Sequence, residues 1–334
     1  MKKLLALALA LIMVLGLAVC AQAEEYKMAC YWPAPDTFFD SYVLKGIEAF
    51  EAEYGQDVEW MIGTDWTQDI ENQSVEALRA QGYDLFLIFP ADSTAANGLF
   101  QEMYDSGAEV VGYAGTTAEP STYAVCYASD VYQMGYDSAK MLIEYMGGKG
   151  TIINVLENLN DVNTQKRQAG VEAAVAEYPD VSIVQTVGDI ATVDVGFEKI
   201  SDAIAANAGV NGIITTGGTA SIALANALSD YYGSNPDAEH IYAATVDQSP
   251  EVMAAIENGY LDHTLAQNGY GMGYLSCVTL TYLKQGWEPI NFGAHVNSGS
   301  LKITKDNLTT WEEDLAQVTV DIAATIETDI LQKP

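Results

Sequence analysis

Along most of its 334 residues, this chain alternates short apolar runs with amphipathic stretches, and the alternation occurs in two successive series. In the first series, strands and helices are predicted in turn at 27–32, 37–54, 58–62, 67–80, 84–89, 95–105 and 109–113. The run at 84–89, DLFLIF, is continuously apolar after Asp84, which is typical of a strand covered on both faces. Strands that alternate with helices predict a parallel, doubly wound α/β sheet.

The second series is of similar size and predicts a second α/β unit. Its helices and strands are expected at 131–145, 151–156, 164–177, 182–187, 195–206, 212–216, 220–231 and 241–246. No linker rich in Gly, Ser or Pro separates the two series, so we expect a direct crossover near 115–130. A strand at 263–267, a helix at 272–284 and a tail with an acidic helix at 310–328 complete the chain.

The first 23 residues have the order of a secretory signal. Lys2 and Lys3 precede an apolar run, and Ala21-Gln22-Ala23 forms a cleavage site. A membrane anchor is the alternative, but the apolar run is short for a span and has no stop-transfer flank. Cys20, within a sequence similar to a lipobox, leaves lipid attachment open. We therefore expect a secreted or cell-envelope protein.

The chain is strongly acidic, with a formal net charge of −32. Loss of two signal lysines would take this to −34, which argues against nucleic acid and anionic membrane surfaces as partners. Cys30, Cys126 and Cys277 are widely spaced in apolar contexts, so we expect buried thiols and no disulfide framework. The three histidines show no metal-ligand spacing, and no nucleophile elbow G-x-S-x-G is present. We expect no cofactor, no metal and no enzymatic activity.

Polar residues follow two strands predicted near the end of the second series. Asp247 ends one apolar run and Gln267 ends the next. Between them, Ser249 is a predicted helix N-cap, Pro250 the first helical residue and Gly259 the helix stop. Ligands bind at the carboxyl ends of strands in open α/β sheets. The segment therefore predicts a site for a small polar molecule.

A family resemblance rests on a set of short motifs in a defined order. They are Asp36-Thr37-Phe38-Phe39, Phe89-Pro90-Ala91-Asp92-Ser93, Ser129-Asp130, Arg167 with Gly170, Val246 to Glu251, Leu265-Ala266-Gln267, and LKITKDN at 301–307. With these motifs the chain resembles type I periplasmic substrate-binding proteins of the ribose/galactose class, the receptors of ABC sugar importers. The resemblance covers about 26–304 and is fairly specific for the fold, but not for the ligand.

The resemblance implies two doubly wound parallel-sheet lobes joined by a three-strand hinge. The N-terminal lobe would comprise 24–115 plus 267–290, and the C-terminal lobe 116–266 plus 291–334. Closure about the hinge would trap the ligand, a motion typical of such receptors.

The same resemblance implies the binding residues. Sugars are held by an aromatic ring stacked on an apolar face and by planar polar groups that bind hydroxyls. Phe38 and Phe39 match the stacking position, and at least one of them is expected to face the ligand. The residues that match hydrogen-bonding positions are Asp92, Asp247 and Gln267. Trp32, Trp66 and Tyr113, at or after strand ends, could line the cleft or belong to the rim or core.

Some positions depart from the family pattern. Ser93 and Gln165 stand where ribose-type relatives carry arginines, and Gly217-Gly218 stands in place of an Asn-Asp pair. Without these arginines a phosphate or carboxylate ligand would lack its usual bidentate partner. We expect a neutral ligand. An amine-bearing ligand stays open, because carboxylates and aromatic rings can together bind a cation.

These features predict an extracytoplasmic, monomeric receptor that delivers a sugar or polyol to an ABC permease. Ligand-stabilised closure would be the whole mechanism, with no catalytic step. Two alternatives stay open: a sensory module for a chemoreceptor or kinase, and a receptor for an amine or a nucleoside.

Overall fold

The computed structural model describes residues 27–35, 37–159 and 161–334. The predicted signal, its cleavage site and Cys20 lie outside the described residues. The chain divides into two compact units. Unit 1 comprises the chain up to Ala128 together with Asn268–Gly299 and Ala316–Pro334, and unit 2 comprises Ser129–Gln267 and Ser300–Leu315. Among the described residues, no helix has both the length and the apolar character that a membrane span requires.

Unit 1 is built on a six-stranded sheet in which every strand pairs in parallel with its neighbours. In spatial order the strands are β12 (Ala294–Asn297), β5 (Val125–Ala128), β4 (Glu109–Tyr113), β3 (Leu85–Ile88), β1 (Met28–Trp32) and β2 (Val58–Ile62). Buried side chains cover both faces of this sheet, in two separate clusters.

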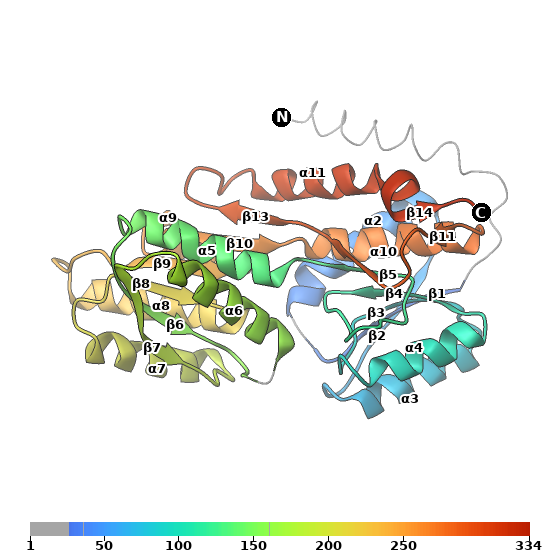
Figure 1. Ribbon diagram of the computed structural model, residues 1–334, viewed down its shortest axis with the longest axis horizontal. Helices are drawn as coiled ribbons and strands as arrows, with labels where there is room; N and C mark the ends of the chain where they lie inside the picture. Colours follow the sequence, from blue (N-terminus) through green and yellow to red (C-terminus); the bar gives the residue numbers. More distant parts are fainter. Residues whose placement is uncertain (1–26, 36, 160) are drawn as a thin grey trace. The chain divides into compact units, whose positions relative to one another are not determined.

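Helices cover the two faces of the unit 1 sheet (Figure 1). One face packs against α3 (Gln68–Ala80) and α4 (Ala96–Asp105). The other packs against the π-helical turn η1 (Phe39–Val43), α2 (Leu44–Tyr54) and α10 (Gly269–Lys284). Helices α2 and α10 approach closely at Gly46, where an added Cβ would lie 2.0 Å from the Tyr270 carbonyl oxygen.

Unit 2 repeats the arrangement with a second six-stranded sheet. Its strands, in spatial order, are β13 (Ser300–Ile303), β10 (His263–Gln267), β9 (Tyr242–Val246), β8 (Gly212–Thr215), β6 (Gly150–Val155) and β7 (Val181–Val187). All pairs are parallel except β13, which runs antiparallel to β10.

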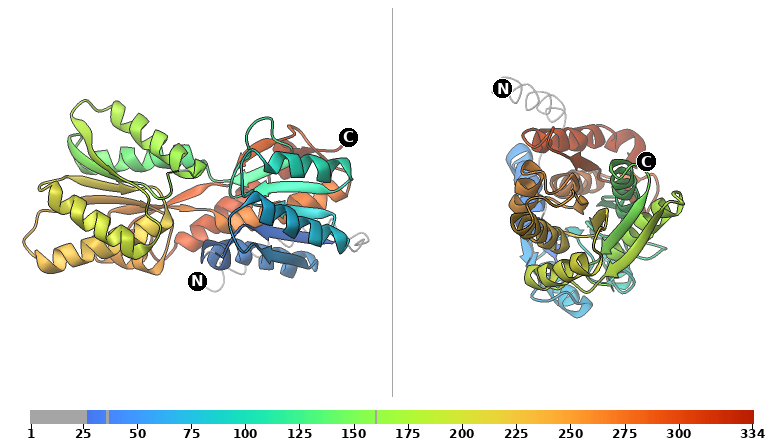
Figure 2. Two further views of the ribbon diagram at one scale, coloured as in Figure 1. Left: turned by 90° about the horizontal axis from the view of Figure 1, so that it is seen from below. Right: turned by 90° about the vertical axis from the view of Figure 1, so that its left-hand side faces the viewer.

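Helices also cover both faces of the unit 2 sheet, as Figure 2 shows from further directions. One face packs against α5 (Val131–Tyr145) and α6 (Val162–Ala176). The opposite face packs against α7 (Val193–Ala206), α8 (Gly218–Ser234) and α9 (Pro250–Glu257). The predicted cap of α9 is confirmed, because the Ser249 side chain accepts a hydrogen bond from the Val252 N–H at 3.2 Å.

Both sheets share one strand order, which confirms the predicted doubly wound α/β fold. Along the chain, the first five strands of each unit lie in the order 2-1-3-4-5, and a strand from the C-terminal part of the chain is added beside the fifth. The order reverses between β1 and β3 in unit 1 and between β6 and β8 in unit 2. At such a switch point, the carboxyl ends of the strands leave a crevice suited to a ligand.

The bounds of the units differ from the lobe bounds expected from the sequence. Residues 116–128, 291–299 and 316–334, which the sequence analysis placed in the C-terminal lobe, belong to unit 1, and Gln267, which it placed in the N-terminal lobe, belongs to unit 2. For 116–128 and 291–299 the reason is strand pairing, since β5 pairs with β4, and β12 in turn pairs with β5. The last segment joins unit 1 because Ile326, Ile330 and Leu331 are buried in its core. The chain passes between units after Ala128, Gln267 and Gly299, and a fourth time within α11 (Trp311–Ala323).

Candidate functional site

In unit 1, aromatic rings gather around Trp32 at the carboxyl end of β1. The Trp32 ring centroid lies 5.3 Å from that of Phe39, 4.8 Å from that of Phe89 and 5.7 Å from that of Tyr113. Trp32 is 1% exposed, and among the described residues its indole N–H has no hydrogen-bond partner. The group forms because β1, β3 and β4 are neighbours that end at the same edge of the sheet.

The two residues expected to stack on a ligand differ in exposure. Phe39 is fully buried in the core of unit 1, whereas Phe38 is partly exposed. The Phe38 ring lies over Gly269, where an added Cβ would come within 2.9 Å of it. Its centroid is 6.4 Å from that of Trp32, with the rings inclined by 25°. Of this pair, Phe38 is therefore the ring that keeps exposed surface.

Tyr113 lies in the core. It is fully buried, and its hydroxyl donates a hydrogen bond to the Tyr31 carbonyl oxygen at 3.0 Å and lies 3.1 Å from Cys30 Sγ. Burial raises the pKa of Tyr113 well above its usual value. The structure thus places Tyr113 beneath the aromatic group, with its hydroxyl already paired.

Asp92 belongs to the loop that follows β3, and Trp66 lies against this loop. Trp66 is 43% exposed, its ring meets Phe89 edge to face at 4.9 Å, and its Nε1 donates to the Ala91 carbonyl oxygen at 2.9 Å. Asp92 is exposed, and its Oδ1 accepts from the N–H groups of Thr94 and Ala95, each at 2.8 Å. These backbone hydrogen bonds lower the pKa of Asp92. Asp92 is therefore an ionised group that also caps the turn before α4.

In unit 2, the structure brings together Asp247 and Gln267, as their strand-end positions predict. Strands β9 and β10 are parallel neighbours, so residues that follow them meet. Asp247 has a left-handed backbone, with φ of 67°, and its Oδ1 accepts from Gln267 Nε2 at 2.7 Å. Burial raises the pKa of Asp247, although Arg167 and the bond from Gln267 act against this.

Glu157 belongs to the same edge of the unit 2 sheet, and the sequence analysis missed it. It follows β6, and its Oε1 accepts from the Ala220 N–H at the start of α8, at 2.9 Å. Helix α8 has no side-chain cap of its own, because its N-cap is Gly217. A Cβ added at Gly217 would lie 2.3 Å from Glu157 Cδ, so the carboxyl fills the space that this glycine leaves. The Gly217-Gly218 pair was the sequence signal that a side chain from another segment could occupy this space.

Charge at this edge of unit 2 is unbalanced toward the negative. Burial is the main cause that raises the pKa of Glu157, and the nearby Asp247 raises it further. Arg167 offsets both carboxyls, but its Nη1 already donates to the Thr216 carbonyl oxygen at 3.0 Å. Gln165 is exposed on α6, and its Nε2 donates to the Leu159 carbonyl oxygen at 2.9 Å. The Gln165 amide is therefore hydrogen-bonded to the loop that precedes α6.

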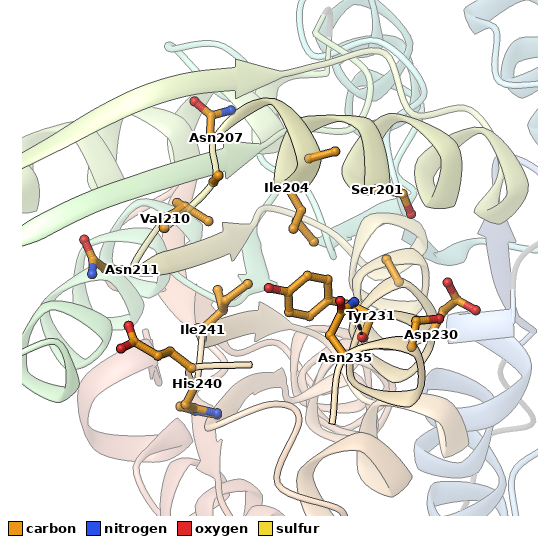
Figure 3. Close-up of a pocket in the computed structure, with 16 residues that line it drawn as sticks. Ser201, Ile204, Asn207, Val210, Asn211, Asp230, Tyr231, Asn235, His240 and Ile241 are labelled. Carbon is orange, nitrogen blue, oxygen red and sulfur yellow. Dashed lines mark hydrogen bonds between the residues drawn. The ribbon is translucent and has the colours of Figure 1, made fainter. Parts of the chain in front are cut away.

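A separate pocket of about 530 Å³ lies in unit 2 between α7 and α8 (Figure 3). Tyr231 and Ile241 line it, and Asp230 and Glu239 are among its polar lining residues. It is near the segments that precede β8 and β9, so it lies at the amino ends of these strands, away from Asp247 and Gln267. No group of three His, Cys, Asp or Glu side chains in the described chain is placed to hold a metal ion.

Comparison with known proteins gives one family and many structural relatives. The model of the family described as "Periplasmic binding protein domain" matches residues 30–288. An ABC transporter solute-binding protein from Burkholderia graminis, solved with D-arabinose, is similar with a TM-score of 0.77 and 21% identity, over 87% of this chain and 99% of that one. One from Bacillus halodurans, solved with myo-inositol, has a TM-score of 0.76 and 16% identity, over 88% and 99%.

Among curated proteins, the D-apiose import binding protein of Actinobacillus succinogenes is 28% identical over 100 residues. The match covers 30% of this chain and 32% of that protein, about a third of its length.

Proposed function

The chain belongs to the periplasmic binding protein domain family, and we propose that it is an extracytoplasmic receptor for a sugar or polyol. In this role it would pass the bound solute to an ABC permease in the membrane. It would act as a monomer without a catalytic step.

The observation that carries the proposal is the Asp247–Gln267 pair at the carboxyl ends of β9 and β10. A carboxylate and an amide that are bonded to each other hold fixed directions, and each keeps further capacity for hydrogen bonds. Such planar groups suit the hydroxyls of a sugar. Each polar atom of the sugar left unpaired in a closed site would weaken binding by about 1–3 kcal/mol. Unit 1 would contribute the partly exposed Phe38 ring and the Asp92 carboxylate.

The charges favour a solute without anionic groups. Asp92, Asp247 and Glu157 would repel a phosphate or carboxylate. The nearby cation, Arg167, already donates from Nη1 to the Thr216 carbonyl oxygen and offsets the Asp247 and Glu157 carboxyls. The relatives solved with D-arabinose and myo-inositol bind neutral polyhydroxylated molecules, in keeping with this choice. Because Glu157 lies beside Asp247, an amine-bearing sugar is the second candidate.

A thermal-shift screen over sugars, polyols, amino sugars and nucleosides would identify the solute, because binding to the folded state raises the unfolding temperature. We then expect Gln267→Ala to weaken binding of that solute by about tenfold or more in calorimetry, as a lost buried hydrogen-bond partner would. Gln168→Ala, which removes a surface amide of the same unit bonded to Glu172, is the control and should bind normally. Normal binding by Gln267→Ala would refute this site.

A further inference from the structure

Residues 89–92, here called the 89–92 loop, connect β3 to the turn that Asp92 caps. Ala91 in this loop is fixed on both sides of its backbone. Its N–H donates to Glu71 Oε2 at 2.6 Å, and its carbonyl oxygen accepts from Trp66 Nε1 at 2.9 Å. Asp92, a candidate ligand residue, follows directly. The two bonds therefore set the position of the loop from which Asp92 projects.

Glu71 is an unusual residue for this position. It lies on α3 one turn before Val75, on the face that packs against the unit 1 sheet, and it is fully buried. A buried carboxylate is destabilising unless it is paired or well hydrogen-bonded. Besides Ala91, its Oε1 accepts from Gln68 Nε2 at 3.0 Å. No cation pairs with it among the described residues.

The surroundings of Glu71 make it titrate near neutrality. Burial raises the pKa of Glu71 from 4.5 to about 7, and the Asp92 carboxylate adds to the rise, while the bonds from Ala91 and Gln68 oppose it. In the described chain, the titratable groups that act on it are Asp92, from the 89–92 loop, and Tyr31, from β1. Neither adds a positive charge, so the carboxyl is stabilised only by hydrogen-bond donors.

We propose that Glu71 is a positioning residue for the ligand: its ionised carboxyl holds the 89–92 loop in the binding conformation, and proton uptake loosens the loop and weakens binding. The proposal rests on the proposed function, because it assigns Asp92 and its loop to the ligand site. Each oxygen of the ionised carboxyl accepts one hydrogen bond, from Ala91 or from Gln68. A proton on either oxygen removes one acceptor, and the remaining bond is no longer charge-assisted.

The first test needs no ligand. The Trp66 indole N–H resonance, assigned with Trp66→Phe, is followed by NMR between pH 5 and pH 9. It should shift with a midpoint near 7, because Trp66 and Glu71 both hydrogen-bond to the backbone of Ala91, Glu71 through its N–H and Trp66 through its carbonyl oxygen. The shift should vanish in Glu71→Gln, which keeps an acceptor but cannot ionise. It should persist in Glu76→Gln, an exposed carboxyl on the same helix. An unchanged titration in Glu71→Gln would overturn the proposal.

The second test measures binding of D-arabinose and D-apiose by calorimetry at pH 6 and pH 8. Wild-type protein and Glu76→Gln should bind about fivefold more tightly at pH 8, the difference expected between a charge-assisted and a neutral hydrogen bond. Glu71→Gln should bind equally at both pH values. The proposal is wrong if Glu71→Gln keeps the wild-type pH dependence. If wild-type protein binds neither sugar, these two solutes are excluded, and the NMR titration alone decides whether Glu71 controls the loop.

Discussion

Glu71 also links the stability of the fold to pH. Between 4.5 and about 7 the folded state keeps the Glu71 proton more tightly than the unfolded chain does, since the folded pKa is raised. Stability from this residue is therefore fully present below pH 4.5 and is lost as pH rises through 7. From the two pKa values, the loss between pH 5 and pH 8 is about 2 kcal/mol.

We expect Glu71→Gln to remove this part of the pH dependence. The free energy of unfolding is measured by urea denaturation at pH 5 and at pH 8. Wild-type protein should lose about 2 kcal/mol between these pH values through Glu71, and Glu71→Gln should not show this loss. Glu76→Gln serves as the matched control. The same pH slope in wild type and Glu71→Gln would show that the Glu71 carboxyl titrates normally in the fold.

At the scale of elements, helix α8 receives its N-terminal cap from a strand end distant in sequence. The carboxyl of Glu157 lies where a side chain at position 217 would have to fit. We predict that Gly217→Ala displaces Glu157 and lowers stability by about 1 kcal/mol, the usual value of a cap. In Glu157→Ala, where the carboxyl is absent, the same substitution should be tolerated, so the two changes are non-additive.

Gly233→Ala in the last turn of α8 is the matched control for Gly217→Ala. An added Cβ at Gly233 meets nothing within 4 Å, so this change should be neutral or stabilising by up to about 1 kcal/mol. Thermal unfolding of the four variants tests the expectation. Additive effects of Gly217→Ala and Glu157→Ala would contradict the described cap.

The alternation of apolar runs was sufficient to predict most elements of both sheets, because each strand and helix is encoded by its own segment. Strand β5 was not predicted, since it has only four residues and follows β4 without an intervening helix. The places of β12 and β13 beside β5 and β10 were also beyond prediction, because they depend on pairing between segments distant in sequence.

For the site, the sequence predicts those residues whose positions follow from the end of one recognisable strand. Asp247 and Gln267 each end a recognisable strand, so their proximity follows from one parallel pair. Glu157 contacts the Ala220 N–H 63 residues away, which requires that β6 and β8 be neighbours. The core position of Tyr113 and the loop contact of Glu71 likewise depend on packing that no single segment specifies.

For the whole molecule, we propose that groups from both units bind one solute. The units share a strand order, and each presents candidate ligand groups at the carboxyl ends of its strands. If groups of both units bind the solute only in a closed state, the solute shifts the population toward that state, as the proposed receptor mechanism requires.

The most direct test is a crystal structure of the protein with the solute that the thermal-shift screen identifies. We predict one solute molecule within hydrogen-bond distance of Asp247 and Gln267 from unit 2, with the Phe38 ring of unit 1 against its apolar face. A solute bound to one unit alone, or in the pocket beside Tyr231, would contradict this proposal.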